Sequence, residues 1–234
     1  MMKIYLIRHG KTMFNTIGRA QGWSDTPLTK EGQAGITAVG LGIASKGIKF
    51  DRAYSSDSGR TIQTMNLILK HSDNDGIPYK MDWRIREWCF GSFDGGYDGD
   101  LFEGVLPRIF AETNADRKPK STAEIARAIY EVDTAGWAET WEELSGRIID
   151  GFSEMAKEAE EAGAENVVIV SHGMTISTFV ELIRPEEGRP HGLENGSVTE
   201  LDYQAGKFTV KEVGSLVYRH LGREIMEDKR KLAL

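Results

Sequence analysis

Two apolar runs of strand length each end abruptly in a histidine that is followed by a glycine. Residues 4–10 read Ile-Tyr-Leu-Ile-Arg-His-Gly, and residues 167–173 read Val-Val-Ile-Val-Ser-His-Gly. In an α/β protein, ligands bind at the carboxyl ends of parallel strands. The repeated pattern therefore predicts one site that brings His9 and His172 together at the same edge of a sheet.

Strand-like and helix-like segments alternate along the chain. Helical periodicity or capping signals mark residues 30–46, 58–70, 141–163 and 174–183, and strand patterns mark residues 2–8, 50–54, 78–84 and 167–170. Residues 197–203 and 207–213 alternate apolar and polar side chains around a short turn, as in a hairpin. This order predicts an α/β fold: a three-layer α/β/α sandwich with a mostly parallel central sheet and an antiparallel edge.

Residues 91–138 interrupt this regularity because glycine and proline break every long period. We expect a small irregular cap insertion here, within a single domain spanning residues 1–234, with short helices near 101–113 and 122–132. Its basic residues offer contacts to a carboxylate or a second phosphate: Arg108, Arg117, Lys118 and Lys120. The charge-rich residues 224–234 are expected to fray.

Composition narrows the class of protein. A formal net charge of −7 argues against a nucleic-acid binder, which is usually basic. No stretch approaches the ~18 consecutive apolar residues of a membrane helix, and no apolar signal segment opens the chain. The single cysteine, Cys89, cannot form an internal disulfide, which fits a reducing cytoplasm. We therefore expect a cytoplasmic protein without nucleic-acid or membrane partners, while its oligomeric state is not encoded in any readable pattern.

Arg8, His9 and Gly10 supply groups that phosphoryl transfer needs. A neutral histidine held in one tautomer can attack a phosphoryl group. A neighbouring arginine offers planar N–H donors that match phosphate oxygens, and its charge disfavours the imidazolium form of the histidine. Glycine allows close approach of the backbone. Taken alone, the triplet also fits a surface turn.

A second arginine follows the next predicted strand. Residues 55–60 read Ser-Ser-Asp-Ser-Gly-Arg and lie between that strand and a helix. Arg60 either points inward, as a second guanidinium on the phosphate, or lies in solvent beyond a capped helix N-terminus. The local sequence leaves both interpretations open.

Glu87 is the candidate proton donor. Poor solvation and a nearby phosphate would both favour its protonated form, so that it could donate. The aromatic residues expected to exclude water from it are Trp83, Trp88 and Phe90. The alternative is a surface carboxylate paired with Arg84 or Arg86.

His172 ends a buried-looking strand and precedes a helix, whose amino end favours an anion. The alternative for this residue is an ordinary core histidine. Among the other histidines, His191 lies in a loop rich in proline and glycine, from which it could approach the site.

No metal and no cofactor are expected. The sequence lacks H-x-x-x-H, H-E-x-x-H and paired cysteines, and arginines beside the two histidines would repel a cation. It also lacks G-x-x-x-x-G-K-[ST] and G-x-G-x-x-G, so a nucleotide-binding loop has no support.

Several segments, in their order along the chain, carry a family resemblance. They are residues 6–12 with Asn15, residues 18–29, residues 53–56 and 59–61, Glu87 with Gly91, residues 170–173, and residues 194–199. Together they resemble the histidine phosphatase superfamily, also called the phosphoglycerate mutase-like family, over nearly the whole chain. The resemblance implies an α/β/α sandwich in which the strand before His9 is central, and chemistry that uses no metal.

The resemblance also implies roles for single residues. His9 would be the nucleophile that becomes phosphohistidine, and Glu87 the general acid for the leaving oxygen and then the base for water. The implied catalytic set is His9, Glu87, His172, Arg8 and Arg60. The implied substrate-binding set is Arg8, Asn15, Gln21, Gly22, Arg60, His172 and Gly173.

The family contains phosphatases and mutases. Residues 25–29 and 195–199 look more like the broad-specificity phosphatase branch, and residues 93–120 do not look like the basic insertion of the mutases. The leading hypothesis is thus a phosphoric monoester hydrolase acting on a small phosphorylated metabolite. The alternatives are a phosphoglycerate mutase that uses the same histidine, and a catalytically weak phospho-ligand binder, which would usually lack the nucleophile or the acid.

Overall fold

The computed structural model describes residues 1–113 and 121–232. Residues 114–120 and 233–234 lie outside these ranges, and so do the contacts expected of Arg117, Lys118 and Lys120. The helical segments of the described residues are α1 (Met13–Ile17), α2 (Lys30–Ser45), α3 (Gly59–His71), η1 (Trp83–Ile85), η2 (Gly91–Phe93), η3 (Asp100–Val105), α4 (Leu106–Thr113), α5 (Thr122–Val132), α6 (Trp141–Glu161), α7 (Gly173–Ile183), η4 (Pro185–Glu187) and α8 (Val217–Leu232).

The strands form one six-stranded sheet in the order β3-β2-β4-β1-β5-β6 among the described residues. They are β1 (Met2–Arg8), β2 (Arg52–Ser55), β3 (Tyr79–Met81), β4 (Asn166–Ser171), β5 (Val198–Gln204) and β6 (Lys207–Ser215). The first four strands of this order are parallel, whereas β5 pairs antiparallel with both β1 and β6. The predicted, mostly parallel sheet with an antiparallel edge is confirmed, and β1 lies inside it.

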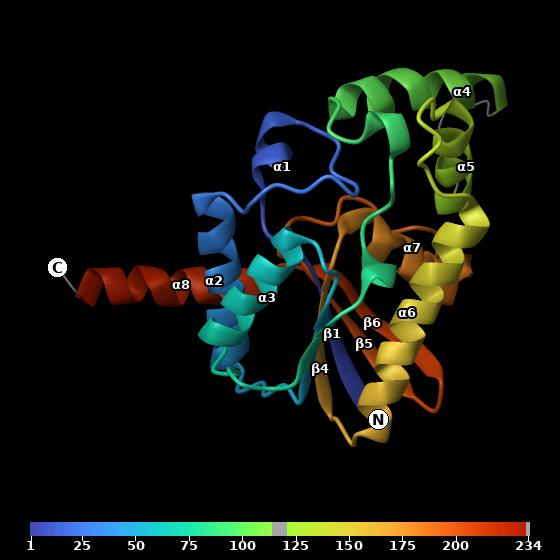
Figure 1. Ribbon diagram of the computed structural model, residues 1–234. Helices are drawn as coiled ribbons and strands as arrows, with labels where there is room; N and C mark the ends of the chain where they lie inside the picture. Colours follow the sequence, from blue (N-terminus) through green and yellow to red (C-terminus); the bar gives the residue numbers. More distant parts are fainter. Residues whose placement is uncertain (114–120, 233–234) are drawn as a thin grey trace.

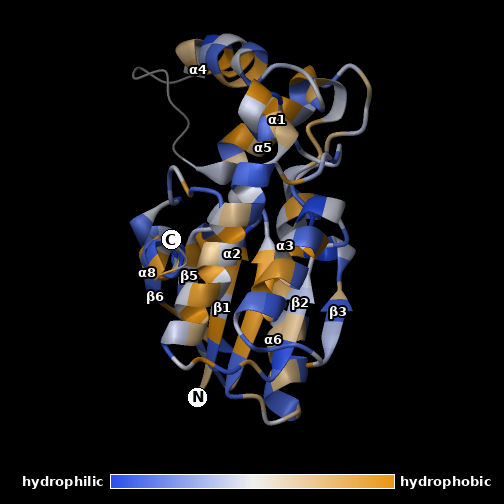
Figure 2. Ribbon diagram, turned by 90° about the vertical axis from the view of Figure 1, so that its left-hand side faces the viewer, coloured by the Kyte–Doolittle hydropathy of each residue, from blue (hydrophilic) through white to orange (hydrophobic). Residues whose placement is uncertain are grey.

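Strand β1 divides the core into two layers because its side chains alternate between the faces of the sheet. Ile4 and Leu6 pack in one buried cluster with α6 and α7. Tyr5 and Ile7 pack in a second cluster with α2, α3 and α8. Figure 1 shows the two helical layers on either side of the sheet, and Figure 2 shows α2 and α3 lying over one face of it. The three-layer α/β/α sandwich is therefore confirmed.

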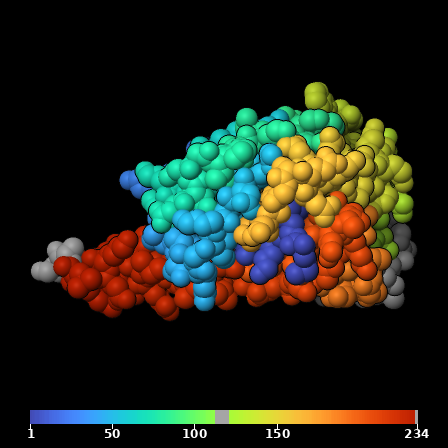
Figure 3. Space-filling model, turned by 90° about the horizontal axis from the view of Figure 1, so that it is seen from below, coloured from blue at the N-terminus to red at the C-terminus, as the bar shows by residue number. Residues whose placement is uncertain are grey.

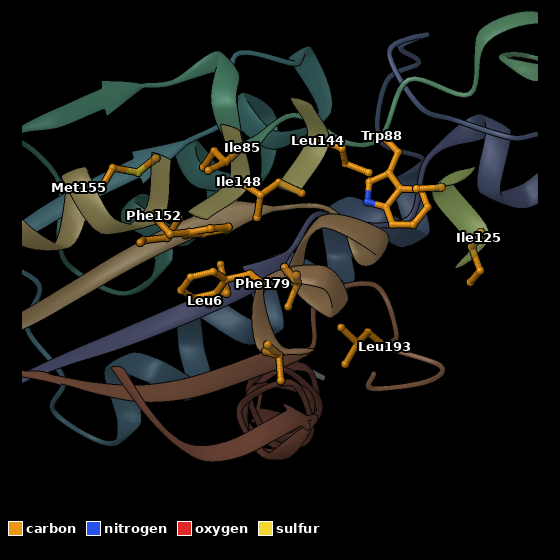
Figure 4. Packing of buried hydrophobic residues seen from close by; sticks show 14 of the residues in the cluster. Leu6, Ile85, Trp88, Ile125, Leu144, Ile148, Phe152, Met155, Phe179 and Leu193 are labelled. Atoms are coloured by element: carbon orange, nitrogen blue, oxygen red, sulfur yellow. The ribbon is translucent and has the colours of Figure 1, made fainter. Parts of the chain in front are cut away.

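Phe152 of α6 and Phe179 of α7 join their helices over the first face. Their rings stack with centroids 4.2 Å apart, and Figure 4 shows them beside Leu6 and Ile148. Stacked aromatic pairs of this kind stabilise a core beyond their area alone. This packing fixes α7, whose first residue follows His172 directly.

Residues 91–113 and 121–138 lie above the carboxyl ends of the parallel strands (Figure 1). These residues hold α4 and α5 close to the expected positions, and a π-helical turn, η3, precedes α4. Leu101, Phe110 and Ile125 belong to the same buried cluster as Leu6 and the α6 residues. The described part of the cap thus packs directly on the end of the sheet where the histidines lie.

The expectation that residues 224–234 fray is wrong for its described part. Helix α8 continues to Leu232 and extends past the rest of the molecule, as Figures 1 and 3 show. Its first turns cross α2 at very close range: a Cβ on Gly222 would overlap the carbonyl of Ala38, and one on Gly42 would overlap the carbonyl of Tyr218. Glycine at both contacts lets the two backbones touch.

Candidate active site

The two histidines meet where β1 and β4 end side by side. Arg8 pairs with Ser171 in the parallel register, and the backbone N–H of His9 donates to the Ser171 carbonyl at 3.0 Å. The imidazole rings of His9 and His172 lie 5.3 Å apart between centroids, edge to face. The predicted convergence of the two histidines at one sheet edge is confirmed.

His9 is held in one tautomer. Its Nδ1 lies 2.8 Å from the carbonyl oxygen of Gly10, and a carbonyl can only accept, so Nδ1 carries the proton. Nε2 is therefore left with a lone pair. Burial, together with the charges of Arg60 and Arg8, holds the pKa of His9 well below its ordinary value. The imidazole of His9 is thus neutral at neutral pH, with Nε2 unprotonated.

Arg8 lies beside His9 with one N–H group uncommitted. Its Nη1 donates to the carbonyl of Leu193, while its buried Nε has no hydrogen-bond partner in the described part of the chain. A Cβ on Gly173 would lie only 3.2 Å from that Nε, so glycine at this position leaves room for the guanidinium group. A buried, unpartnered N–H is costly unless a ligand completes it.

The hydrogen bonds of His172 also fix its tautomer. Arg60 Nε can only donate, and it lies 3.2 Å from Nδ1 of His172, so Nδ1 is the acceptor. Nε2–H then donates to Ser56 Oγ at 2.7 Å, and Ser56 Oγ lies 2.8 Å from Thr61 Oγ1. His172 is fully buried, and both of its ring nitrogens are engaged by protein groups. Both sequence interpretations therefore hold in part: His172 is a buried histidine, and its ring packs against that of His9.

Arg60 points inward, and the alternative of a solvated side chain is wrong. It is 0% exposed. Within the described residues, each of its N–H groups has a protein acceptor: His172 Nδ1, the carbonyls of Gln21, Gly22 and Ser24, and Asp25 Oδ1 at 2.8 Å. Arg60 therefore brings positive charge close to His9 and also holds residues 21–25 in place.

Asp94 completes the support of this loop, and the sequence analysis missed it. Its carboxylate accepts from the backbone N–H groups of Gly22, Trp23 and Ser24, from the Ser24 hydroxyl and from Phe90 N–H, at 2.7–3.2 Å. It thereby joins the start of the cap to the loop that surrounds Arg60. No local pattern signals this role, because the partners lie about seventy residues earlier in the chain.

Glu87 sits at the amino end of α7. Its Oε1 accepts from Thr175 N–H at 2.9 Å, from the Thr175 hydroxyl and from Trp88 N–H, whereas Oε2 accepts from Met174 N–H at 3.1 Å. Oε1 is thus crowded with donors, and Oε2 is the oxygen with room for a proton. The residue is buried.

The neighbours of Glu87 differ from those expected. Arg84 pairs with Asp82 and Glu154, and Arg86 pairs with Asp57, so the predicted surface pairing of Glu87 with either arginine is wrong. Trp83 is 52% exposed and does not shield Glu87, whereas Trp88 and Phe90 are buried.

Arg147 of α6 holds the segment that carries Glu87. Its guanidinium donates to the carbonyls of Arg84, Arg86 and Glu87 at 2.8–3.0 Å and pairs with Glu139. The sequence analysis missed this buried arginine too, because it lies inside an ordinary amphipathic helix.

A cavity of about 250 Å³ is lined by both His9 and Glu87. The predicted site residues that line it are Arg8, His9, Asn15, Gln21, Glu87 and Gly173. Gly22, Arg60 and His172 are not among its lining residues and lie behind it. Residues that the sequence did not indicate for the site also line it, namely Arg19, Asp98, Met174, Ser177 and Arg189. Phe102, one of the aromatic residues of segment 91–138 expected to line a pocket or form a small core, lines it too. His191 lines the cavity as well, so its expected approach to the site is confirmed.

Asn15 and Asn195 connect the wall of the cavity to the backbone of His9. Asn195 Nδ2 donates to the carbonyl of His9 at 3.0 Å and to Asn15 Oδ1 at 3.2 Å. Asn15 Oδ1 also accepts from Thr12 N–H. With its oxygen engaged twice, Asn15 has its amide N–H groups to offer to a ligand. Gln21, by contrast, is bonded to Thr12 and Thr26 at both ends of its amide.

No cluster of three or more His, Cys, Asp or Glu side chains in residues 1–113 and 121–232 is placed to hold a metal ion. No helix in the same ranges has the length and apolar character to cross a membrane.

Comparison with known proteins identifies the family. The model of the histidine phosphatase superfamily (branch 1) matches residues 4–215. The chain therefore belongs to the histidine phosphatase superfamily, and the family and the enzyme class predicted from its motifs are confirmed.

Individual relatives include both activities of the family. The broad-specificity phosphatase YOR283W of Saccharomyces cerevisiae is 28% identical over 98% of this chain and 93% of its own. A 2,3-bisphosphoglycerate-dependent phosphoglycerate mutase of Lachnoclostridium phytofermentans is 27% identical, with 90% of each chain covered. The crystal structure of a phosphoglycerate mutase from Bacillus anthracis str. Sterne is 36% identical, with a TM-score of 0.87 over 95% of this chain and 96% of that chain.

Proposed function

We propose that this protein is a metal-independent phosphatase that hydrolyses a small phosphomonoester through a phosphohistidine on His9. One observation carries the proposal. The bond from Nδ1 to the Gly10 carbonyl leaves the Nε2 lone pair of a neutral, buried imidazole, beside an arginine with an unpartnered N–H. A fixed neutral nucleophile next to a fixed cation is what attack on a phosphate ester requires.

In the first step, His9 Nε2 attacks phosphorus and an N–P bond forms while the ester P–O bond breaks. The leaving oxygen takes a proton from Glu87, held on Oε2, so that an alcohol departs. In the second step, water attacks the phosphohistidine and gives its proton to Glu87. The N–P bond breaks, its electron pair returns to Nε2, and phosphate is released. The proton that Glu87 gives to the leaving oxygen in the first step is replaced by a proton from water in the second, so the carboxyl group ends in its starting state.

The groups around His9 stabilise the charge on the transferred phosphoryl oxygens. Arg8 Nε, Arg189 Nε and the amide N–H groups of Asn15 belong to residues on the cavity wall and have no partner in the described part of the chain. Arg60 and His172 act from behind: Arg60 contributes its charge and holds residues 21–25, and His172 holds Arg60 and packs against the ring of His9. Electrostatic stabilisation of this kind is the main protein contribution to phosphoryl transfer.

The cavity supports a small substrate. Its volume of about 250 Å³ suits a phosphorylated metabolite of a few carbon atoms, and cap residues such as Phe102 line its outer part. We infer that residues 91–138 act as a cap within one domain of residues 1–234 and set the choice of leaving group. That leaving group would lie against Arg19, Asp98 and Arg189.

A phosphoglycerate mutase is the second candidate, and the 36% identity to the Bacillus anthracis mutase favours it. Against it stands Asp98, whose carboxylate has no hydrogen-bond or ion-pair partner among the described residues and faces the field of Arg8 in the cavity. A mutase must accommodate bisphosphoglycerate, and an unpaired carboxylate repels its second phosphate.

Phosphate release tests the proposal and separates the candidates. The purified protein is assayed with sugar phosphates, phosphoglycerates, nucleotides and phosphoamino acids, with and without EDTA, and with His9→Ala as the control. We expect release from at least one small ester, no effect of EDTA, and no release by His9→Ala. Conversion of 3-phosphoglycerate to 2-phosphoglycerate that depends on a bisphosphoglycerate primer, with little phosphate released, would establish the mutase instead. Binding of phosphate without any turnover would leave only a phospho-ligand binder.

A further inference from the structure

A second cavity adjoins the catalytic one at Arg8. Its volume is about 490 Å³, roughly twice that of the catalytic cavity. The two linings have only Arg8, Gly192 and Leu193 in common. Its other walls come from the start of α2, from residues 193–195 and from the α8 helix, none of which the proposed reaction uses as a binding surface.

The side chains around this cavity are mainly cationic. Besides Arg8, they include Lys11, Arg219 and Arg223, against the two carboxylates of Glu31 and Glu194. This surplus of positive charge stands out in a chain of net charge −7. A local cationic concavity in an acidic protein attracts anions, because the walls exclude water and concentrate the field.

The two carboxylates leave this charge available. Lys11 pairs with Glu31 at 3.0 Å, but the Glu31 side chain is 71% exposed, and such surface pairs are weak. Glu194 pairs with Arg219 at 2.7 Å and is itself largely exposed. Both carboxylates can therefore turn into solvent when an anion takes their place.

The arginines offer free donors. Arg223 is exposed and has neither a hydrogen bond nor an ion pair in the described part of the chain. The buried Nε of Arg219 has no partner in the same ranges, although its Nη1 donates to the Asn195 carbonyl at 3.0 Å. Planar guanidinium groups bind oxyanions through two parallel hydrogen bonds. An oxyanion would therefore supply acceptors for the free N–H groups of both arginines.

We propose that this cavity is a second anion site, which binds a small multivalent oxyanion through Lys11, Arg219 and Arg223. The ligand would carry either two phosphoryl groups or several carboxylates, since both present the same oxygen geometry to arginine. Apart from Arg8, Gly192 and Leu193 the two cavities have separate linings, so the two sites can be filled at the same time.

Gly35 gives a way to block the site without touching its charges. It lines the cavity in the middle of α2, and a Cβ added there would meet no atom within 4 Å. Leucine at this position would project into the cavity, and it is a better helix former than glycine. Gly146 is the matched control: it is also helical, also has open space around its Cβ, and lines none of the cavities described here.

The test is isothermal titration calorimetry at low ionic strength, with pyrophosphate and, separately, with citrate. For pyrophosphate we expect two binding sites per chain in the wild type and in Gly146→Leu, but one in Gly35→Leu. Arg223→Gln should weaken one of the two sites by about tenfold and leave the other unchanged. Melting temperatures no lower than that of the wild type show that the leucine variants are folded.

The citrate titration distinguishes the sources of the anion. Citrate binding that Gly35→Leu removes indicates a site for polycarboxylates, and a site seen only with pyrophosphate indicates one for phosphorylated ligands. A single pyrophosphate site in the wild type together with no citrate binding overturns the proposal, and so does equal binding by Gly35→Leu and Gly146→Leu. The comparison of Gly35→Leu with Gly146→Leu concerns the second cavity alone and needs no turnover, so its outcome is separate from that of the proposed phosphatase activity.

Discussion

The Nε of Arg60 donates to Nδ1 of His172 across 3.2 Å, in the fully buried layer behind His9. This bond makes His172 a fixed acceptor on one side and a donor to Ser56 on the other. It also shows that the guanidinium is committed to protein groups. Arg60 is thus as much a structural part of the site as a source of charge.

Replacing Arg60 by lysine should therefore reduce stability as well as activity. An ammonium has three N–H donors on one atom and cannot satisfy acceptors on four residues of the 21–25 loop together with His172. We expect the free energy of unfolding in urea to fall by about 2–4 kcal/mol and kcat/KM to fall by at least ~100-fold.

Arg19→Lys provides the control for this measurement. Arg19 also lines the catalytic cavity, but it lies over the Tyr97 ring with one bond to the Gly95 carbonyl. Its loss should change the free energy of unfolding by less than about 1 kcal/mol. If Arg60→Lys lost activity but kept wild-type stability, Arg60 would be a simple phosphate ligand.

Acid pH should destabilise the fold through the two buried histidines. Burial, with Arg60 as the next cause, lowers the pKa of both His9 and His172 well below 6.5. Below pH 6.5 the two histidines bind protons in the unfolded chain but stay neutral in the folded protein. Protonation therefore favours the unfolded chain, and the stability present above pH 6.5 is lost as the pH falls. The slope is about 1.4 kcal/mol per pH unit for each histidine.

Urea unfolding at pH 7.5 and pH 5.5 measures this contribution. The loss of stability between the two values should be smaller in His9→Gln than in the wild type, by about 1.4 kcal/mol. Carboxylates titrate equally in both proteins and cancel from the comparison. The exposed His220, replaced by glutamine, serves as the control and should leave the difference as in the wild type. An unchanged difference in His9→Gln would mean that His9 is not held neutral by its surroundings.

The sequence was sufficient to predict the layers and the meeting of the histidines, because both follow from local patterns. Alternation along β1 assigns Ile4 and Leu6 to one face and Tyr5 and Ile7 to the other. The parallel pairing of β1 with β4 then places the ends of the two strands together. Register and periodicity alone carry these conclusions.

The supporting residues could not be predicted in the same way. Asp94, Arg147 and Asn195 act through backbone groups that lie far away in the chain. A carboxylate that collects backbone N–H groups looks, in sequence, like any loop aspartate. The extension of α8 was also missed, because its stability comes from the contact of Gly222 with α2 rather than from its own charged sequence.

Glu87→Gln should slow the reaction in a way that depends on the leaving group. Glutamine can still accept from Thr175 and Trp88 through its oxygen, but its amide is not an acid and cannot transfer a proton to the leaving oxygen. An alkyl phosphate such as β-glycerophosphate needs that proton, so its kcat should fall by about 10²–10⁴-fold. With p-nitrophenyl phosphate, whose leaving group is stable as an anion, the fall should be much smaller. Equal losses with the two substrates would show that Glu87 does not donate to the leaving oxygen.

The close crossing of α2 and α8 makes a last prediction about glycine. Gly222→Ala places a methyl group into the Ala38 carbonyl, so the helices must separate, which should cost about 1–3 kcal/mol of unfolding free energy. Gly35→Ala, in α2 with open space around its Cβ, should instead gain about 0.5–1 kcal/mol, because alanine restricts the unfolded chain and favours the helix. Thermal and urea unfolding measure the change in unfolding free energy of both variants. A loss for Gly222→Ala and a gain for Gly35→Ala would support the close contact of α8 with α2. If both substitutions stabilised the protein alike, α8 would not rest on α2 at this distance, and its projection beyond the sheet would need another explanation.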